Sequence, residues 1–169
     1  MSTKRRRPPN ELPWTLDLGS TVKDSTLVEF KVWAPQAKSL SVKFFNQGME
    51  PLSLQKDNSG YWKGHASPIG AGTTYKYVIN ESLERPDPAS RYQPEGVHGP
   101  SQVIDPHAFT WTDQNWKGLS LEKYIIYELH VGTFSPESTF DGVIAKLPYL
   151  RDQIGVTAIE LLPVAQCQG

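Results

Sequence analysis

Two short apolar runs near the end of the chain constrain its fold more than any other feature. They cover residues 124–131 and 156–162, each about as long as a strand, and the segment between them has apolar residues at helical spacing. Two strands joined by a helix form a βαβ crossover, in which the strands are parallel. The sequence therefore predicts one parallel βαβ unit at this end, like the start of a barrel.

The middle of the chain follows a different pattern. Residues 27–34 and 39–45 alternate apolar and polar side chains, and the runs at 60–65 and 73–80 are rich in Tyr and Trp. Alternation with a period of two is typical of strands that bury one face, and turn residues such as Pro35 separate these runs. Several short strands with turns between them predict an antiparallel β-sandwich.

The remaining segments set the predicted domain boundaries. The first residues are basic and lack periodicity, so a flexible tail is expected, with Trp14 as its one possible anchor. The predicted divisions are a tail at 1–26, a sandwich at 27–106, a linker at 107–122 and the start of a barrel at 123–169.

Residues 84–106 contain five prolines, which predicts a long loop that ends in a short strand at 102–104. This loop is expected to be a connector in which the arginines pair with Asp87 or Glu95. The alternative is a substrate-facing loop that brings Arg85, Arg91 or His98 to a sugar.

Charge and composition exclude several classes of function. The chain has 17 basic and 18 acidic residues, and its net charge of −1 favours neither nucleic acid nor a membrane surface. Cys167 is the only cysteine, so no intrachain disulfide can form and a cytoplasmic location is expected. The four histidines are widely separated, so neither a metal site nor a cofactor is expected. No apolar run is long enough to span a bilayer.

Several strings in this sequence resemble a known family. The strings at the C-terminal end are YELHVGTF at 127–134, TFD at 139–141, KLPYL at 146–150 and GVTAIELLPVAQ at 155–166. They look like the first βαβ of the catalytic barrel in the alpha-amylase superfamily (glycoside hydrolase family 13). Within it they are most similar to the maltooligosyltrehalose trehalohydrolases and then to the glycogen branching enzymes.

The likeness extends upstream of the barrel strings. Residues 85–101 also resemble the trehalohydrolases. VWAP at 32–35 and GTTYKY at 72–77 resemble the immunoglobulin-like early-set module that precedes glucan-active barrels and often resembles starch-binding domains.

This resemblance implies both a fold and a function. The fold is mostly β, with an immunoglobulin-like early-set β-sandwich followed by the first βαβ unit of a truncated (β/α)8 barrel, because a whole barrel takes about 250 residues. The function is that of the N-terminal fragment of a glycoside hydrolase that acts on α-1,4-glucans and hydrolyses maltooligosyltrehalose to release trehalose. A glycogen branching enzyme and a stand-alone glucan-binding module remain as alternatives. The implied partners are an α-glucan or malto-oligosaccharide and the remainder of the chain's own barrel.

No catalytic residue is expected among these 169 residues. In the superfamily that the strings resemble, the aspartate nucleophile, the glutamate acid/base and a second aspartate come from later strands. Glu128 and Glu160 lie on the two predicted barrel strands, but we do not pair them as catalytic carboxylates. The chain alone is therefore expected to be inactive.

Aromatic residues of the strands are the candidates for sugar binding, because pyranose rings stack on flat aromatic faces. A position in the core or at an interface is the alternative for each. The candidates are Trp62, Tyr61, Tyr75 and Trp33. Trp62 is preferred because Gly60 and Gly64 leave the backbone beside it open to approach.

His130 is a further substrate-binding candidate. It shares a strand face with Glu128, and that face is assigned to the barrel interior, near the mouth where chemistry takes place. His130 is expected either to reach a sugar hydroxyl or to be a hydrogen-bonded core residue, and Glu128 is expected to be structural.

The crossover helix has recognisable ends. Ser138 or Thr139 is expected to cap it, Pro148 to kink or break it, and Gly155 to end it. The residues expected to pack on the sheet are Phe140, Ile144, Leu147 and Leu150.

Overall fold

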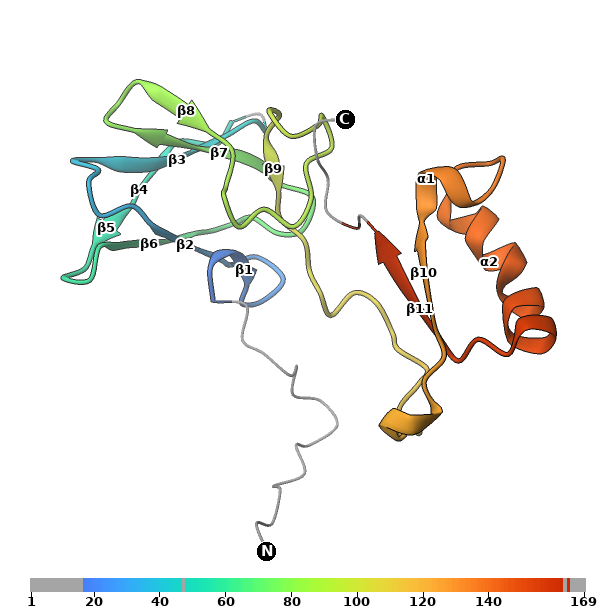
Figure 1. Ribbon diagram of the computed structural model, residues 1–169. Helices are drawn as coiled ribbons and strands as arrows, with labels where there is room; N and C mark the ends of the chain where they lie inside the picture. Colours follow the sequence, from blue (N-terminus) through green and yellow to red (C-terminus); the bar gives the residue numbers. More distant parts are fainter. Residues whose placement is uncertain (1–16, 47, 163, 165–169) are drawn as a thin grey trace, which may run out of the picture. The chain divides into compact units, whose positions relative to one another are not determined.

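A computed structural model of the protein describes residues 17–46, 48–162 and 164, and the chain divides into two compact units, the first ending at Thr112 and the second beginning at Asp113 (Figure 1). The predictions for residues 1–16, including Trp14, and for Cys167 lie outside the described residues.

The first unit is an antiparallel β-sandwich. One sheet has the order β1-β2-β6-β5, formed by Gly19–Val22, Val28–Trp33, Tyr61–Ala66 and Gln55–Lys56. The other has the order β4-β3-β7-β8, formed by Leu52–Ser53, Leu40–Phe44, Thr74–Ile79 and Leu83–Arg85, with β9 (Ser101–Gln102) also paired to β7. The predicted sandwich is confirmed.

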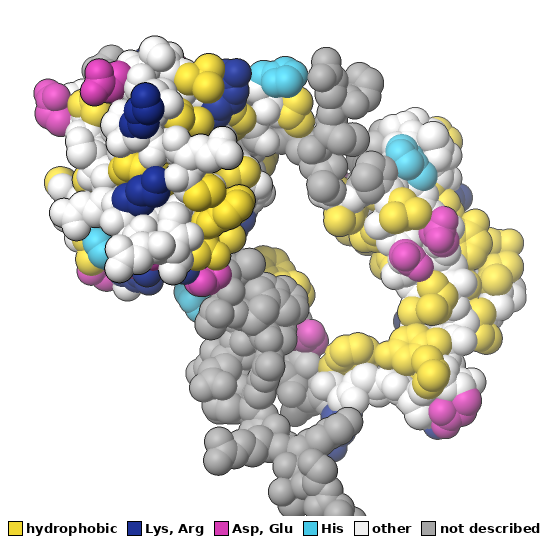
Figure 2. Space-filling model, turned by 60° about the vertical axis from the view of Figure 1, so that its left-hand side comes forward, with side chains coloured by type: hydrophobic (Ala, Val, Ile, Leu, Met, Phe, Trp, Pro, Cys, Tyr) yellow, Lys and Arg dark blue, Asp and Glu magenta, His cyan; other side chains and the backbone are white. Residues whose placement is uncertain are grey.

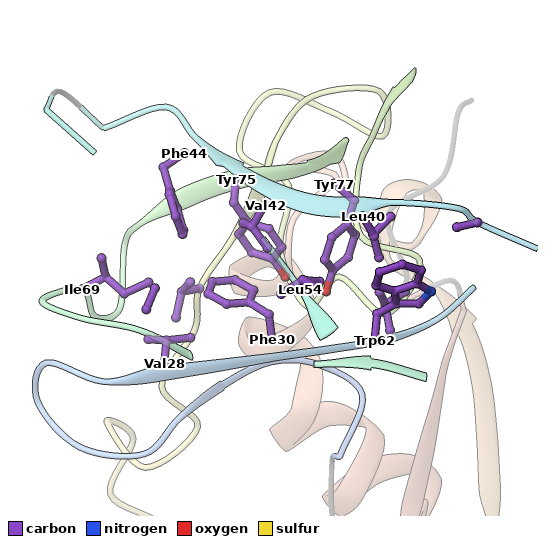
Figure 3. Close-up of a cluster of buried hydrophobic side chains, with 14 residues drawn as sticks. Val28, Phe30, Leu40, Val42, Phe44, Leu54, Trp62, Ile69, Tyr75 and Tyr77 are labelled. Atoms are coloured by element: carbon purple, nitrogen blue, oxygen red, sulfur yellow. The ribbon is translucent and has the colours of Figure 1, made fainter. Parts of the chain in front are cut away.

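Alternation along the strands builds the core between the two sheets. The inward side chains of β2, β3 and β7 are buried, as the period of two predicts: Val28, Phe30, Val32, Leu40, Val42, Phe44, Tyr75 and Tyr77. Figure 3 shows these side chains filling the space between the sheets, where the rings of Phe30 and Tyr75 meet edge to face with centroids 4.9 Å apart. Such a geometry is favourable for aromatic pairs.

Two boundaries of the sandwich differ from the prediction. Strand β1 lies inside the segment expected to be a flexible tail, and it pairs with β2 from Gly19 opposite Lys31 to Val22 opposite Val28. Its sequence, GSTV, is too short and too polar to carry an alternating signal. The short strand after the proline-rich loop is Ser101–Gln102 rather than residues 102–104.

The second unit is a βαβ unit with a parallel sheet. The 3-10 helix η1 (Leu121–Lys123) precedes β10 (Ile126–His130), which is followed by α1 (Val131–Phe134), α2 (Phe140–Tyr149), a π-helix (Leu150–Ile154) and β11 (Ala158–Leu162). Strands β10 and β11 are parallel, with Ile126 opposite Ala158 and Glu128 opposite Glu160. The predicted crossover is confirmed.

The face of α2 that packs on this sheet differs in part from the one expected: Leu147 packs there as predicted and Leu150 is buried, but Phe140 and Ile144 do not follow. Val143 and Leu147 pack against Leu129 and the β11 side chains Ile159 and Leu161. Phe140 and Ile144 are instead 55% and 58% exposed, so the expectation that they pack on the sheet is wrong. Figure 2 shows hydrophobic side chains spread over the surface of this unit. Val143, Leu147 and Leu150 also have the i, i+4, i+7 spacing of one helix face. Val143 and Leu147 of this face pack on the sheet, whereas Phe140 and Ile144 lie on a neighbouring face.

The ends of α2 follow the prediction more closely than its middle. The Thr139 hydroxyl accepts a hydrogen bond from the Gly142 amide at 3.2 Å, and Gly155 ends the helical segment with φ +81°. The helix continues through Pro148 to Tyr149, so the predicted break before Pro148 is wrong. A π-helical turn follows directly, from Leu150 to Ile154. Within the described part, no helix has the length and apolar character needed to cross a membrane.

Candidate functional site

The outer face of β2 and β6 brings two of the predicted candidates together. Trp33 lies directly opposite Tyr61 in the antiparallel ladder, and Lys31 lies opposite Lys63. These residues alternate with the buried ones, so their side chains point away from the core. Trp33 is 57% exposed and Tyr61 is half-buried. We call Trp33, Tyr61 and Lys31 the Trp33 surface.

Local packing holds Trp33 at the edge of this face. Its indole Nε1 donates to the Ser59 carbonyl at 3.3 Å. Gly60 allows the tight turn beside it, because Gly60 has φ +86° and a Cβ there would lie 2.8 Å from the Pro35 Cβ. A hollow of about 490 Å³ adjoins the ring and is lined by Trp33, residues 34–37, Ile79 and Asn80. This gives an aromatic wall with amide groups close by.

Charged side chains surround the two rings. The Lys31 ammonium lies 4.9 Å from the centre of the Tyr61 ring and 2.8 Å from the Asp17 carboxylate. The hydrogen bond that the Lys31 ammonium donates to Asp17 raises the pKa of Lys31, so this cation stays charged. A flat ring bordered by hydrogen-bonding groups is chemically suited to a sugar, whose ring face is apolar and whose edge carries hydroxyls.

The structure places Trp62 and Tyr75 in the core, where their rings cannot stack on a sugar, so the prediction that they bind sugar is wrong. Trp62 is 6% exposed and its Nε1 donates to the Ala34 carbonyl at 2.9 Å, while Tyr75 is 1% exposed. Adjacent residues on a strand point to opposite sides, so only one of Tyr61 and Trp62 can face solvent. Gly64 does not open the surface to a ligand; a Cβ there would lie 2.6 Å from Leu54 Cδ2.

Asp87, which the sequence offered only as a partner for an arginine of the loop, is a key residue of the sandwich. It is 4% exposed, and its Oδ2 accepts hydrogen bonds from the hydroxyls of Tyr75 at 2.5 Å and Tyr77 at 3.3 Å. Its Oδ1 accepts from the Ala89 amide at 2.8 Å, and its own amide donates to Ser101 Oγ at 3.0 Å. Burial raises the pKa of Asp87, although these bonds and the nearby Arg91 charge act in the opposite direction.

Arg91 joins the proline-rich loop to β1. Its guanidinium donates to the carbonyls of Ser20 and Leu18, and its charge opposes the rise that burial causes in the pKa of Asp87. The sequence signals for these contacts were the density of polar and proline residues in the loop and the expected pairing of its arginines with Asp87 or Glu95. The contacts of Arg91 and Asp87 support the connector interpretation of this segment.

His130 belongs to the second unit, whereas the Trp33 surface belongs to the first. It is exposed at the C-terminal end of β10, on the strand face that also carries Glu128. The neighbouring Leu129 points the other way, toward α2. The face with Glu128 and His130 is therefore the one that α2 leaves uncovered. Within the described ranges, no three His, Cys, Asp or Glu side chains are grouped to hold a metal ion.

Comparison with known proteins identifies relatives of both units. Malto-oligosyltrehalose trehalohydrolase from Saccharolobus solfataricus is 46% identical over 146 residues, which cover 86% of this chain and 25% of the relative. The 1,4-alpha-glucan branching enzyme GlgB from Pseudoalteromonas atlantica is 31% identical over 158 residues, covering 81% of this chain and 22% of the relative. The chain thus spans about a quarter of the length of the curated relatives that it matches.

A solved structure has the same fold. The crystal structure of a protein described as an alpha amylase from Salmonella typhimurium superposes with a TM-score of 0.83 at 37% identity, covering 92% of this chain and 26% of that one. The sequence profile of carbohydrate-binding module 48, the isoamylase N-terminal domain, matches residues 17–108. This segment starts just before β1 and contains the whole sandwich. The chain therefore belongs to the carbohydrate-binding module 48 family.

Proposed function

We propose that this chain is the N-terminal region of a glycoside hydrolase that acts on α-1,4-glucans and hydrolyses maltooligosyltrehalose to release trehalose. The observation that carries the proposal is the succession of a module 48 sandwich and a parallel βαβ unit in one chain that is 46% identical to a trehalohydrolase over 146 residues. Those residues exceed the first unit in number, so the similarity includes part of the second.

The second unit is proposed to begin the catalytic (β/α)8 barrel. In such barrels the helices cover the outside and the chemistry lies at the C-terminal ends of the strands. The packing of α2 on one face of the sheet, with His130 ending β10 on the other, suits this arrangement. The rest of the barrel is then the partner of this unit and supplies the catalytic carboxylates from later strands, as in the superfamily. A chain with a single cysteine suits a reducing cytoplasm.

The Trp33 surface is proposed to contact the glucan. Trp33 and Tyr61 present aromatic rings on one face, with Lys31 and the amides of Gln36 and Asn80 nearby for hydroxyl groups. Titration of maltoheptaose into isotope-labelled protein should shift the NMR signals of Trp33 and Tyr61, and Trp33→Ala should abolish the shifts. Trp116→Ala, which replaces an exposed tryptophan of the second unit, is the matched control. Shifts that persist in Trp33→Ala would place the sugar elsewhere.

Glucan branching is the second candidate, because GlgB is also a relative at 31% identity. The two reactions differ in the acceptor, which is water in hydrolysis and a glucan hydroxyl in branching. Product analysis separates them, since hydrolysis yields free trehalose and branching yields α-1,6 linkages without it.

A further inference from the structure

The turn that follows Trp33 forms one wall of the hollow beside its ring. Residues 34–37 line this hollow together with Trp33 and Asn80. The turn is closed by the Ala37 amide, which donates to the Ala34 carbonyl at 3.1 Å. The position of this turn therefore decides which groups border the exposed ring.

Lys56 holds this turn, although it is not among the residues that line the hollow. Its ammonium donates to the Pro35 carbonyl at 2.6 Å and to the Ala37 carbonyl at 3.2 Å. It also lies 5.6 Å from the centre of the Trp62 ring, its partner across β5 and β6. The charge of Lys56 is thus directed at the backbone of the turn rather than at the space beside Trp33.

The polar side chains around the hollow differ in whether they are already engaged. Asn80 Oδ1 accepts the amides of residues 38 and 39 at 2.8 and 3.3 Å, and Asp57 Oδ1 accepts two backbone amides of the turn after β5 at 2.8 and 2.9 Å. The Gln36 side chain is exposed, lines the hollow and makes no hydrogen bond to another described residue. Gln36 therefore has both its carbonyl and its amino group available for a ligand.

We infer that Gln36 is a specificity-determining residue for a glucosyl ring stacked on Trp33, and that Lys56 is a positioning residue that acts through the turn. A carboxamide donates and accepts, as the hydroxyls at the edge of a sugar do. A turn that is fixed before binding loses less entropy when the sugar binds. This inference rests on the proposed function, because it places glucan at the Trp33 surface.

Titration of maltoheptaose into single variants tests both roles. Gln36→Ala should raise the Kd by about 2- to 12-fold, which corresponds to the loss of one hydrogen bond. Lys56→Met loses both donated bonds but keeps an unbranched side chain beside Trp62, and it should raise the Kd severalfold. Lys56→Arg can still donate to both carbonyls and should recover most of the affinity. The matched control is Lys38→Met, which removes an exposed lysine next to the turn and should leave the Kd unchanged.

The double variant shows whether Lys56 acts through Gln36. Gln36→Ala/Lys56→Met should bind maltoheptaose as Gln36→Ala does, because the group that Lys56 positions is already gone. Independent contributions would multiply in the Kd of the double variant, and that result overturns the positioning role. A Gln36→Ala variant that binds as tightly as the unaltered chain overturns the role of Gln36.

Amide hydrogen exchange without sugar separates this inference from the proposed function. The amides of residues 37–39 are all hydrogen-bonded in the structure, and in Lys56→Met they should exchange faster than in the unaltered chain. Unchanged exchange contradicts the hold of Lys56 on the turn. If exchange is faster but the unaltered chain does not bind maltoheptaose, the proposed glucan site fails and the role of Gln36 fails with it, while the hold of Lys56 on the turn stands.

Discussion

Buried polar side chains occur in this sandwich where segments distant in the sequence supply their partners. Asp87 is held by two tyrosine hydroxyls from β7, by an amide two residues further on and by Ser101. A buried carboxylate without such partners would be costly. The Asp87 contacts therefore fix the proline-rich loop against β7 and β9.

Asp87→Asn should destabilise the protein by about 1–3 kcal/mol at pH 4, because the new amide group cannot accept all the hydrogen bonds that the carboxyl group receives. The effect should shrink as pH rises to 7. Burial raises the folded-state pKa of Asp87 above its unfolded value, so its contribution to stability is complete below about pH 3.9 and is lost as pH rises through the folded pKa.

Urea unfolding of both proteins between pH 4 and pH 7 measures this difference. The matched control is Glu95→Gln, which changes an exposed carboxylate of the same loop and should alter the free energy of unfolding by less than about 0.5 kcal/mol. A difference between wild type and Asp87→Asn that grows with pH would show that the folded pKa of Asp87 is lowered instead.

At the scale of the element, α2 depends on close contact between its first turn and the loop before it. A Cβ at Gly142 would overlap the Ser135 hydroxyl oxygen and would lie 3.0 Å from the Ser135 Cβ and from Glu137 Oε2. Ser135 is buried, so it has little room to move away. Glycine is thus required at this position although it is a poor helix former.

Gly142→Ala should destabilise the second unit by about 1–3 kcal/mol through overpacking, against a helix-propensity gain of about 1 kcal/mol. Thermal unfolding followed by circular dichroism measures the change. Ser135→Gly/Gly142→Ala removes the obstacle and should recover part of the loss. An alanine variant as stable as wild type would show that Ser135 moves away at little cost.

The sequence predicted the strands in which burial of one sheet face alone decides the order of apolar and polar residues. Alternation located β2, β3 and β7, because burial of one sheet face decides which residues are apolar there. It failed for β1, because this strand has only four residues, too few to show alternation. The contact of Arg91 with the Ser20 carbonyl helps to hold it in place. Alternation also failed to separate Tyr61 from Trp62, because two adjacent aromatic residues fit either face. The face of α2 was misassigned because two apolar stripes share one helix.

At the scale of the whole molecule, the two units differ in how much core they have. The sandwich buries a continuous cluster from both sheets, whereas the buried cluster of the second unit consists of Leu129, Val131 and Val143. Among the described strands, β10 and β11 each have a single neighbour, so each leaves one edge open. Local stability follows such differences in buried apolar contact.

Amide hydrogen exchange should therefore be faster in β10 and β11 than in β2. Mass spectrometry of the exchanging protein resolves peptides that cover Ile126–His130, Ala158–Leu162 and Val28–Trp33. Protection of the second unit equal to that of β2 would mean that its small core is stable without the proposed remainder of the barrel.

The most direct test of the account is the reaction of the complete gene product that contains this chain. Incubated with maltooligosyltrehalose, it should release free trehalose and the shortened malto-oligosaccharide, whereas the 169-residue chain alone should release neither. Release of trehalose by the complete protein and not by the chain agrees with a module 48 sandwich that leads into a trehalohydrolase barrel. Formation of α-1,6 branches without trehalose, or cleavage by the 169 residues alone, would contradict it.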